Sequence, residues 1–199
     1  RVFYEMKLVS VELTKVYRQN DSVFINVLDH IRTNTASAYD LQLLNTCVNQ
    51  DVSQQGGLFV TLAARRDVVD NINQKNLSDL EGDSRIFRGE IKGEFPESML
   101  PTLLELELKV GAQIIFIKND QDRRWVNGTI GEIIGIDDEG KFLYIRTDDG
   151  KNYDVERAMW ANVRYTFNEQ EKKIEEEEHG TFTQFPERLA WAITIHKSQ

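Results

Sequence analysis

Residues 184–199 read Gln-Phe-Pro-Glu-Arg-Leu-Ala-Trp-Ala-Ile-Thr-Ile-His-Lys-Ser-Gln, and this stretch decides the fold. Its apolar run, Leu189 to Ile195, is followed by imidazole, ammonium, hydroxyl and amide side chains. Such runs are typical of buried parallel strands, and open α/β sheets bind ligands at the carboxyl ends of these strands. The polar groups suit a phosphate backbone better than an apolar ligand. The sequence therefore predicts a strand that ends at a phosphate-binding site, with an ordinary polar turn as the alternative.

Size and composition describe an ordinary globular protein. At 199 residues the chain can hold one large domain or two small ones. It is 40% hydrophobic and 29% charged, and no apolar run is long enough to span a membrane. The single cysteine, Cys47, excludes an internal disulfide, fits a cytoplasmic location, and is predicted to be a small core residue. The chain stops directly after the polar residues, which we interpret as a boundary within a longer protein.

The charge balance argues against nucleic-acid binding by bulk electrostatics. The net charge is −9 and the isoelectric point is about 4.9, whereas nucleic-acid modules are usually basic. This objection weakens if the nucleic acid lies in a narrow groove shared with another, more basic domain. Part of the acidity is also local, because residues 169–178 hold six glutamates.

The first and last parts of the chain alternate strand and helix patterns, which predicts a parallel sheet. A helix with apolar residues at helical spacing is expected after a cap at Asn20 or Asp21. The other elements predicted here are a strand over 8–16, a weaker helix over 38–48, a strand over 58–62 and a helix over 65–80.

The middle of the chain changes to short strands separated by glycine-containing turns. Asn127-Gly128 and the Asp-Gly-containing stretches near 140 and 150 are turn signals. Strands are expected at 85–95 (two of them), 103–108, 110–118, 129–136, 141–147 and 152–155. The pattern predicts a small antiparallel barrel with an acidic loop, over 123–182, inserted into an α/β domain formed by 1–122 and 183–199. The acidic residues from Glu169 to Gly180 are expected to form a mobile loop or the tip of a β-hairpin.

The carboxyl-terminal motif resembles a known family. The ten residues from Ala190 to Gln199 are similar to the fifth conserved motif of superfamily 1 DNA helicases, and most similar to the PIF-type enzymes of the RecD-like branch. In that family this strand ends beside single-stranded DNA in the second RecA-like motor domain. The resemblance implies that Thr194, His196 and Ser198 meet DNA phosphates, and Lys197 is a further candidate DNA contact.

A second motif supports the same family. Residues 13–21, Leu-Thr-Lys-Val-Tyr-Arg-Gln-Asn-Asp, resemble the fourth helicase motif, whose arginine reaches toward the nucleotide γ-phosphate. The matching residue is Arg18, which we expect to act in catalysis, and Arg18 and Gln19 are the expected nucleotide-binding residues. A guanidinium there stabilises charge on the transferring phosphoryl group. The alternative is a local ion pair between Arg18 and Asp21.

The segment at 108–131 is also similar to this family, where it leads into an SH3-like barrel that helps to hold single-stranded DNA. Lys118 and Asn119 are candidate DNA contacts there, against the alternative of a solvated surface lysine. Trp125 offers a ring on which a base could stack, but core packing is the favoured interpretation.

One segment departs from the family pattern. Thr61 matches a DNA-contacting position, but the Asn that commonly follows it in relatives is absent from Leu-Ala-Ala-Arg-Arg at 62–66. A contact by Thr61 is expected, whereas the contact made by that Asn is in doubt. Arg65 and Arg66 are possible substitutes, although helix starts usually favour acidic residues.

The chain lacks the parts that hold nucleotide phosphates. It has no Gly-x-x-x-x-Gly-Lys-Ser/Thr loop, no apolar strand ending in Asp-Glu for Mg²⁺, and no Cys/His set with metal spacing, so no metal ligands are assigned. ATP and Mg²⁺ are therefore expected to be bound mainly by a first motor domain outside this chain. This chain alone is expected to lack ATPase activity.

The combined prediction is an α/β fold: the second RecA-like, parallel-sheet domain of a helicase with an inserted antiparallel SH3-like barrel. The full-length protein is expected to be an ATP-dependent 5′-to-3′ DNA helicase acting in repair or recombination. Its expected partners are single-stranded DNA and the first motor domain, with no membrane and as a monomer. The competing hypothesis is a non-enzymatic interaction domain derived from half of a helicase motor.

Overall fold

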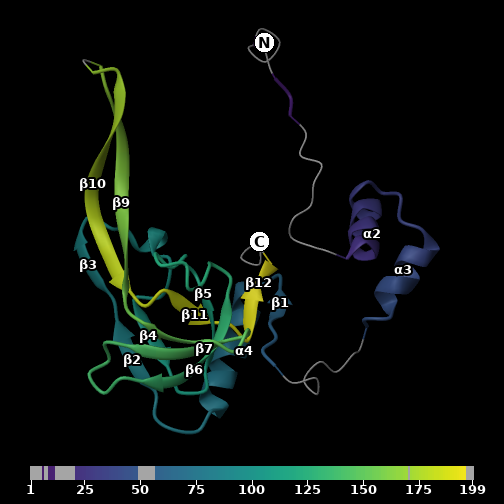
Figure 1. Cartoon of the computed structure of the whole chain (residues 1–199), viewed down its shortest axis with the longest axis horizontal. Helices are drawn as coiled ribbons and strands as arrows, with labels where there is room; N and C mark the ends of the chain where they lie inside the picture. The colour runs from purple at the N-terminus through teal and green to yellow at the C-terminus, as the bar shows by residue number, and fades with distance from the viewer. Residues whose placement is uncertain (1–5, 7–8, 12–20, 49–56, 170, 196–199) are drawn as a thin grey trace. The chain divides into compact units, whose positions relative to one another are not determined.

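The computed structural model describes residues 6, 9–11, 21–48, 57–169 and 171–195. The chain divides into two compact units, Arg1–Asp51 and Val52–Gln199, and each is described by itself below (Figure 1). Most of the strand predicted over 8–16 lies outside the described residues.

The first unit contains the helix α2, Ser22–Arg32, which begins where the sequence predicts. The carboxylate of Asp21 accepts hydrogen bonds from the backbone N–H groups of Val23 and Phe24, at 2.9 and 3.1 Å. These bonds satisfy donors that have no partner within the helix, so Asp21 is the N-cap. Val27 is buried on the apolar face of α2.

A second helix, α3, spans Ala38–Asn45, and a capping box formed by Ser37 and Asp40 fixes its start. Nδ1 of His30 lies 3.1 Å from the Asp40 carboxylate and links α2 to α3. Hydrogen bonds from Ser37, and then from His30, lower the pKa of Asp40 to about 2. Cys47 follows α3 and is exposed, so its predicted core position was wrong because α3 buries little beyond Asp40.

The second unit contains the predicted parallel pair of strands, but both strands are shorter than predicted. Strand β1, Thr61–Ala63, pairs in parallel with β12, Ala192–Thr194, and the helix α4, Arg66–Asp79, packs against both. The prediction of one strand from Leu189 to Ile195 was wrong in extent. Leu189 ends β11, Glu187–Leu189, which pairs with a different sheet, and the chain turns at Ala190 and Trp191 before β12 begins.

A five-stranded antiparallel sheet forms the centre of the second unit, in the order β11-β5-β6-β7-β8. Its other strands are β5 (Gln113–Phe116), β6 (Ile130–Ile136), β7 (Leu143–Thr147) and β8 (Asn152–Val155). The turns between them use glycines with positive φ, at Gly140 and Gly150, as the Asp-Gly signals predict. The core lies on this sheet: Leu77, Phe87, Leu106, Leu108, Ala112, Ile114, Phe116, Trp125, Ile133, Leu143, Ile145, Val155 and Phe185.

The strand composition of this sheet differs from the predicted insertion over 123–182. Strands β5 and β11 come from outside that range, and among the described residues the sheet does not close into a barrel. The sheet gains a strand from outside the predicted range because distant segments pair. Glu187 to Leu189 pair with Phe116 to Ile114, so β11 forms one edge of this sheet and then leads to β12 of the parallel pair. The fold is α/β with mixed sheets.

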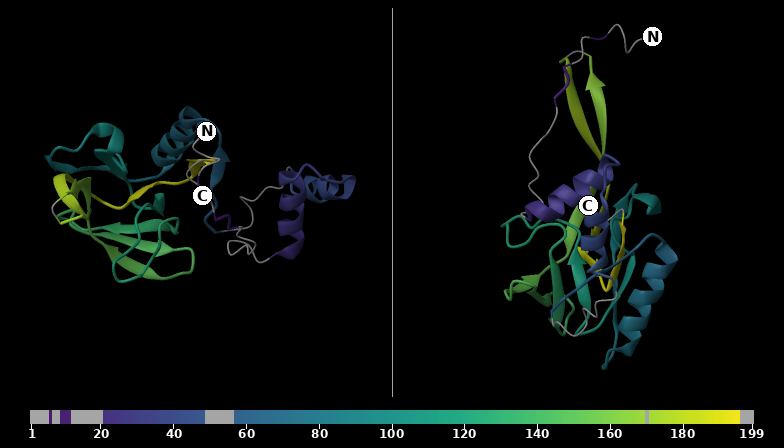
Figure 2. Two further views of the ribbon diagram at one scale, coloured as in Figure 1. Left: turned by 90° about the horizontal axis from the view of Figure 1, so that it is seen from above. Right: turned by 90° about the vertical axis from the view of Figure 1, so that its right-hand side faces the viewer.

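The acidic segment, for which a mobile loop or a β-hairpin tip was predicted, belongs to a β-hairpin. Strand β9, Ala158–Asn168, and strand β10, Lys173–Gln184, form a long antiparallel hairpin that projects from the rest of the second unit (Figure 2). Strand β3, Glu90–Gly93, pairs with the base of β10. The glutamates of β10 face cross-strand partners on β9, and this pairing overrides the local preference of a charged run for a loop.

Strands β2 (Arg85–Arg88) and β4 (Glu105–Leu108) pair separately, and a 3-10 helix covers Glu97–Met99.

Candidate nucleic-acid interface

The two parallel strands end at the same edge. The register places Ala63, the last residue of β1, opposite Thr194, the last residue of β12. The Thr194 side chain is half-buried at this position. Parallel α/β sheets bind ligands outside the carboxyl ends of their strands, so this edge is the candidate site.

Helix α4 adds its amino terminus to the same edge, because it begins at Arg66, three residues after β1 ends. The Arg65 side chain does not cap this helix start, but the Asp67 carboxylate in the first turn interacts with the backbone N–H groups of Asp67 and Val68. A helix amino terminus favours anions through these N–H groups and the helix dipole. The edge therefore combines a hydroxyl group with a positive helix end, which suits a phosphate.

The arginines at this helix start are paired with nearby carboxylates. Arg65 contacts Asp67 at 2.5 Å, and Arg66 lies 3.9 Å from Asp70. Both pairs are exposed, and exposed ion pairs contribute little stability. Either guanidinium can therefore exchange its carboxylate partner at low cost. That these arginines replace the missing Asn stays a prediction.

Only part of the predicted site falls within the described residues. Arg18, Gln19, His196, Lys197 and Ser198 lie outside them. Since His196 to Ser198 follow Thr194 directly in the chain, the sequence connects them to the carboxyl edge of the parallel pair.

Thr61 lies at the opposite end of the pair from Thr194. It opens β1, opposite Ala192, and its side chain is exposed. The two threonines are offset by two residues along the strands, or roughly 7 Å. The parallel pair therefore brings them near each other without placing both at the carboxyl edge.

Lys118 and Asn119 are held by contacts within the protein. The Lys118 ammonium donates to the backbone carbonyl of Met159 and lies 5.0 Å from the centre of the Trp160 ring. Partial burial lowers the pKa of Lys118. The Asn119 side-chain oxygen accepts a hydrogen bond from the N–H of Asn127 at 2.8 Å.

These two residues and Thr194 belong to different parts of the second unit. Lys118 and Asn119 follow β5 of the five-stranded sheet, where the N–H of Ile117 bonds to the carbonyl of Pro186. Thr194 ends β12 of the parallel pair. The predicted contacts are therefore divided between two sheets.

Trp125 packs in the core, as favoured from the sequence. Its ring stacks on the Phe116 ring with the two centroids 4.5 Å apart. The Arg124 guanidinium lies over the Trp125 ring, 4.5 Å from its centroid. Arg124 is held in turn by the Asp120 carboxylate, at 2.7 Å. Trp125 thus contributes to the sheet core rather than offering a free ring to a base.

The sequence analysis missed the buried amides that position β12. Gln113 donates at 2.8 Å to the carbonyls of Phe59 and Ala190, and so joins the segments that lead into β1 and β12. Asn73 of α4 donates to the carbonyl of Ala192 and accepts from its N–H, both at 2.9 Å. A signal was present, because Asn73 stands four residues from both Val69 and Leu77, on the buried face of a helix.

We expect Asn73→Leu to destabilise the second unit by at least about 2 kcal/mol, because it leaves the buried N–H and C=O of Ala192 without a side-chain partner. The measurement is urea unfolding followed by tryptophan fluorescence. Asn71→Leu is the matched control, since Asn71 is exposed on the same helix and should change stability little. Equal stability of the two variants would contradict the positioning role of Asn73.

Two further features of the described residues bear on the site. They contain no group of three or more His, Cys, Asp and Glu side chains that could hold a metal ion. None of the helices within them is long and apolar enough to cross a membrane.

Comparison with known proteins identifies sequences and structures that are similar to this chain. No family model matches it. The human ATP-dependent DNA helicase PIF1 is 31% identical over 96% of this chain, which spans 29% of the human protein. The crystal structure of Bacteroides sp. Pif1 with ADP-AlF4 is 37% identical, with a TM-score of 0.85, over 95% of this chain and 43% of that one. Bacteroides Pif1 bound to single-stranded DNA is 38% identical, with a TM-score of 0.64.

These matches show that the chain has an α/β fold shared with part of the DNA helicases. Among these helicases its relatives are the Pif1 helicases, to which it is homologous over nearly its whole length. The chain corresponds to less than half of each of these relatives.

Proposed function

We propose that this chain is the part of an ATP-dependent DNA helicase that grips single-stranded DNA. The observation that carries the proposal is the carboxyl edge of the parallel pair, where Thr194 and the start of α4 lie together in a chain homologous to Pif1 helicases. A hydroxyl group and the backbone N–H groups of a helix start recognise phosphates without reading bases, so binding should be independent of DNA sequence.

The same proposal assigns nucleotide sensing to Arg18 and Gln19. The chain has no phosphate-binding loop, and its described residues hold no cluster of metal ligands, so it does not fit ATP and Mg²⁺ as a complete site. The proposed arrangement is a first motor domain that binds nucleotide and this chain supplying one guanidinium to the γ-phosphate. The related Bacteroides structure with ADP-AlF4 supports nucleotide use by such a protein.

The acidic balance of the chain fits this proposal when its distribution is considered. The hairpin residues 163–179 hold six glutamates and three lysine or arginine residues, so they account for a net charge of −3 out of −9. At the start of α4, Arg65 and Arg66 are balanced by Asp67 and Asp70, so this edge is formally neutral. DNA bound there avoids the acidic hairpin.

The full-length protein should separate DNA strands in an ATP-dependent reaction that requires a 5′ single-stranded tail. The test compares unwinding of duplexes with a 5′ or a 3′ tail by wild type and Thr194→Val. This variant keeps the side-chain shape and removes the hydroxyl, so unwinding should fall while the fold is retained. Thr166→Val, an exposed change on the hairpin, is the control. Unwinding from a 3′ tail, or no unwinding with either tail, would overturn the proposed activity.

Phosphate contacts beyond β12 give a further prediction. His196→Ala in the full-length protein should weaken single-strand binding similarly for unrelated sequences, and unwinding should fall more than binding because the strand slips between steps. Lys197→Gln should lower the slope of log K against log salt by about one if this lysine neutralises one phosphate. Titrations of labelled DNA at several salt concentrations measure both. Unchanged affinity and unwinding in His196→Ala would remove the proposed grip.

We also propose that the five-stranded sheet corresponds to the SH3-like insertion of these helicases, with residues 123–182 as its main part and β5 and β11 as borrowed strands. The turn glycines and the stacked Phe116 and Trp125 support a compact module. The proposed partners are single-stranded DNA and the first motor domain, and the proposed working form is a monomer.

A further inference from the structure

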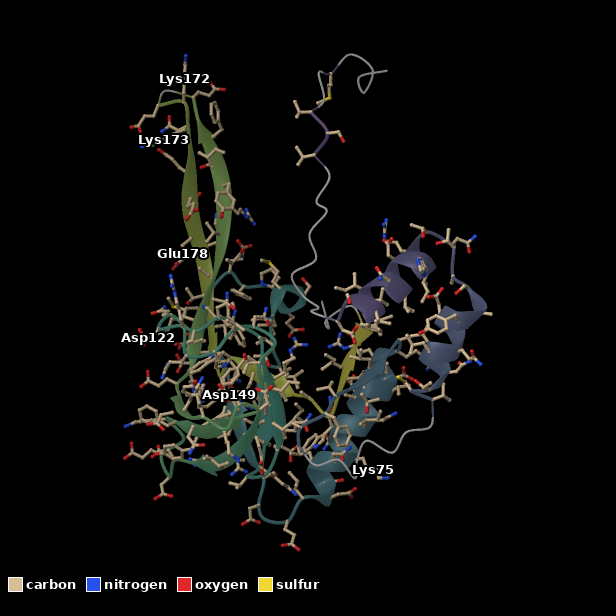
Figure 3. All side chains as sticks on the ribbon, turned by 45° about the vertical axis from the view of Figure 1, so that its right-hand side comes forward. Lys75, Asp122, Asp149, Lys172, Lys173 and Glu178 are labelled. Carbon is tan, nitrogen blue, oxygen red and sulfur yellow. The ribbon has the colours of Figure 1, made fainter. Side chains whose placement is uncertain are left out.

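The β9–β10 hairpin extends well beyond the sheet that supports it. Strand β3 pairs with β10 only at 180–183, whereas β9 and β10 pair up to Asn168 and Lys173. Residues 163–179 therefore form a two-stranded arm, here called the hairpin arm. Lys172 and Lys173 mark its far end and Glu178 lies nearer its base (Figure 3).

One face of the arm is apolar and exposed. Side chains alternate between the two faces of a strand, so Val163, Tyr165 and Phe167 share a face of β9. Ile174 lies directly opposite Phe167 on β10 and adds to the same face. Tyr165, Phe167 and Ile174 are 68%, 63% and 68% exposed. Exposed aromatic and aliphatic side chains gathered in this way are typical of an interaction surface.

The charge beside this face selects a class of partner. Glu176 and Glu178 lie opposite Tyr165 and Val163 on the apolar face, and Glu175 and Glu177 occupy the other face of β10. Six glutamates against three lysine or arginine residues make the arm acidic. An acidic arm repels DNA phosphates and a second copy of this acidic chain, and it favours a basic protein segment.

The arm also has an open strand edge. The sheet order β3-β10-β9 leaves one side of β9 unpaired within the described part of the chain. Near the base, Lys118 covers this edge by donating to the Met159 carbonyl. Strand edges that are not blocked bind extended segments through backbone hydrogen bonds, and alternate side-chain contacts then give specificity. The part of β9 from Val163 to Phe167 has the alternation that such binding requires.

We propose that the hairpin arm is a docking site for a basic, extended segment of a partner protein, which adds as a strand to the open edge of β9. Its apolar side chains cover Tyr165 and Phe167, and its lysine or arginine side chains meet the glutamates of β10. This site is separate from the carboxyl edge of the parallel pair. Partner binding can therefore occur while that edge holds DNA.

The test uses full-length protein and a short, labelled synthetic peptide that alternates lysine with valine, measured by fluorescence anisotropy. A second peptide carries the same side chains but has alternate backbone nitrogens methylated, which prevents strand addition. We expect saturable binding of the first peptide and no binding of the methylated peptide. Phe167→Ser should weaken it about tenfold or more. Ile86→Ser is the matched control, because Ile86 is 62% exposed on β2 and should leave binding unchanged.

Three outcomes would overturn the proposal: no binding of the lysine–valine peptide, equal binding of the methylated peptide, or unchanged binding by Phe167→Ser. A parallel loss of single-stranded DNA affinity in Phe167→Ser would also overturn it, because the arm would then serve DNA. Should Phe167→Ser fail to fold, the fully surface-exposed change Glu176→Lys replaces it and is expected to weaken the basic peptide in the same way. Unchanged affinity in Glu176→Lys would count against the charge complementarity.

Discussion

Arg18→Ala in the full-length protein is expected to lower kcat for ATP hydrolysis by roughly 10³-fold or more, with DNA affinity nearly unchanged. A guanidinium that meets the γ-phosphate stabilises charge that develops as the phosphoryl group transfers, and its removal raises the barrier of that step. DNA affinity should persist because the proposed DNA contacts, Thr194, the start of α4 and the residues after β12, lie in a different part of the chain. Steady-state ATPase assays with saturating DNA, combined with DNA titrations, measure both quantities.

Arg32→Ala is the matched control for this prediction. Arg32 belongs to the same unit and contacts Asp29 at 2.6 Å in an exposed pair, so its loss should leave kcat near normal. A near-normal kcat in Arg18→Ala would instead assign Arg18 to a structural role. The structural role would be an ion pair between Arg18 and Asp21. Because the Asp21 carboxylate is the N-cap of α2, such a pair would affect the stability of the start of that helix.

Glu187→Gln is expected to make the second unit more stable at pH 9, by on the order of 5 kcal/mol, and to change it little at pH 5. Glu187 is fully buried in β11, and neither of its carboxylate oxygens has a hydrogen-bond partner among the described residues. Burial raises the pKa of Glu187 from 4.5 to about 8. The folded state therefore keeps a proton that the unfolded state loses above pH 4.5, and each pKa unit corresponds to about 1.4 kcal/mol.

The sign follows from which state holds the proton. Between pH 4.5 and about 8 the folded wild type binds more protons than the unfolded chain, so stability falls as pH rises through this window. The glutamine variant has no proton to lose and should show no such fall. Urea unfolding at pH 5, 7 and 9, followed by tryptophan fluorescence, measures the free energy of unfolding of both proteins. All three tryptophans lie in the second unit. Glu178→Gln, an exposed control, should keep the wild-type pH dependence. Equal pH dependence in Glu187→Gln and wild type would contradict the prediction.

Elements with local causes could be predicted from the amino-acid sequence. Asp21 caps α2 because its carboxylate reaches two N–H groups in the next turn. The helix α4 follows from apolar residues at helical spacing, and β8 starts at its predicted position because the Asp149-Gly150 turn precedes it. The family resemblance was also available from short motifs, and the homology to Pif1 helicases confirms it.

Only the tertiary structure decided which distant segments pair. Leu189 looks like part of the final strand, but its backbone pairs with Ile114, so the apolar run is divided between two sheets. The glutamates of β10 form a strand because β9 supplies partners across the hairpin. Glu187 and Asn73 are buried polar residues whose surroundings come from segments far away in the chain. Local spacing sets helices, caps and turns, whereas pairing and burial depend on contacts between residues that no local pattern brings together.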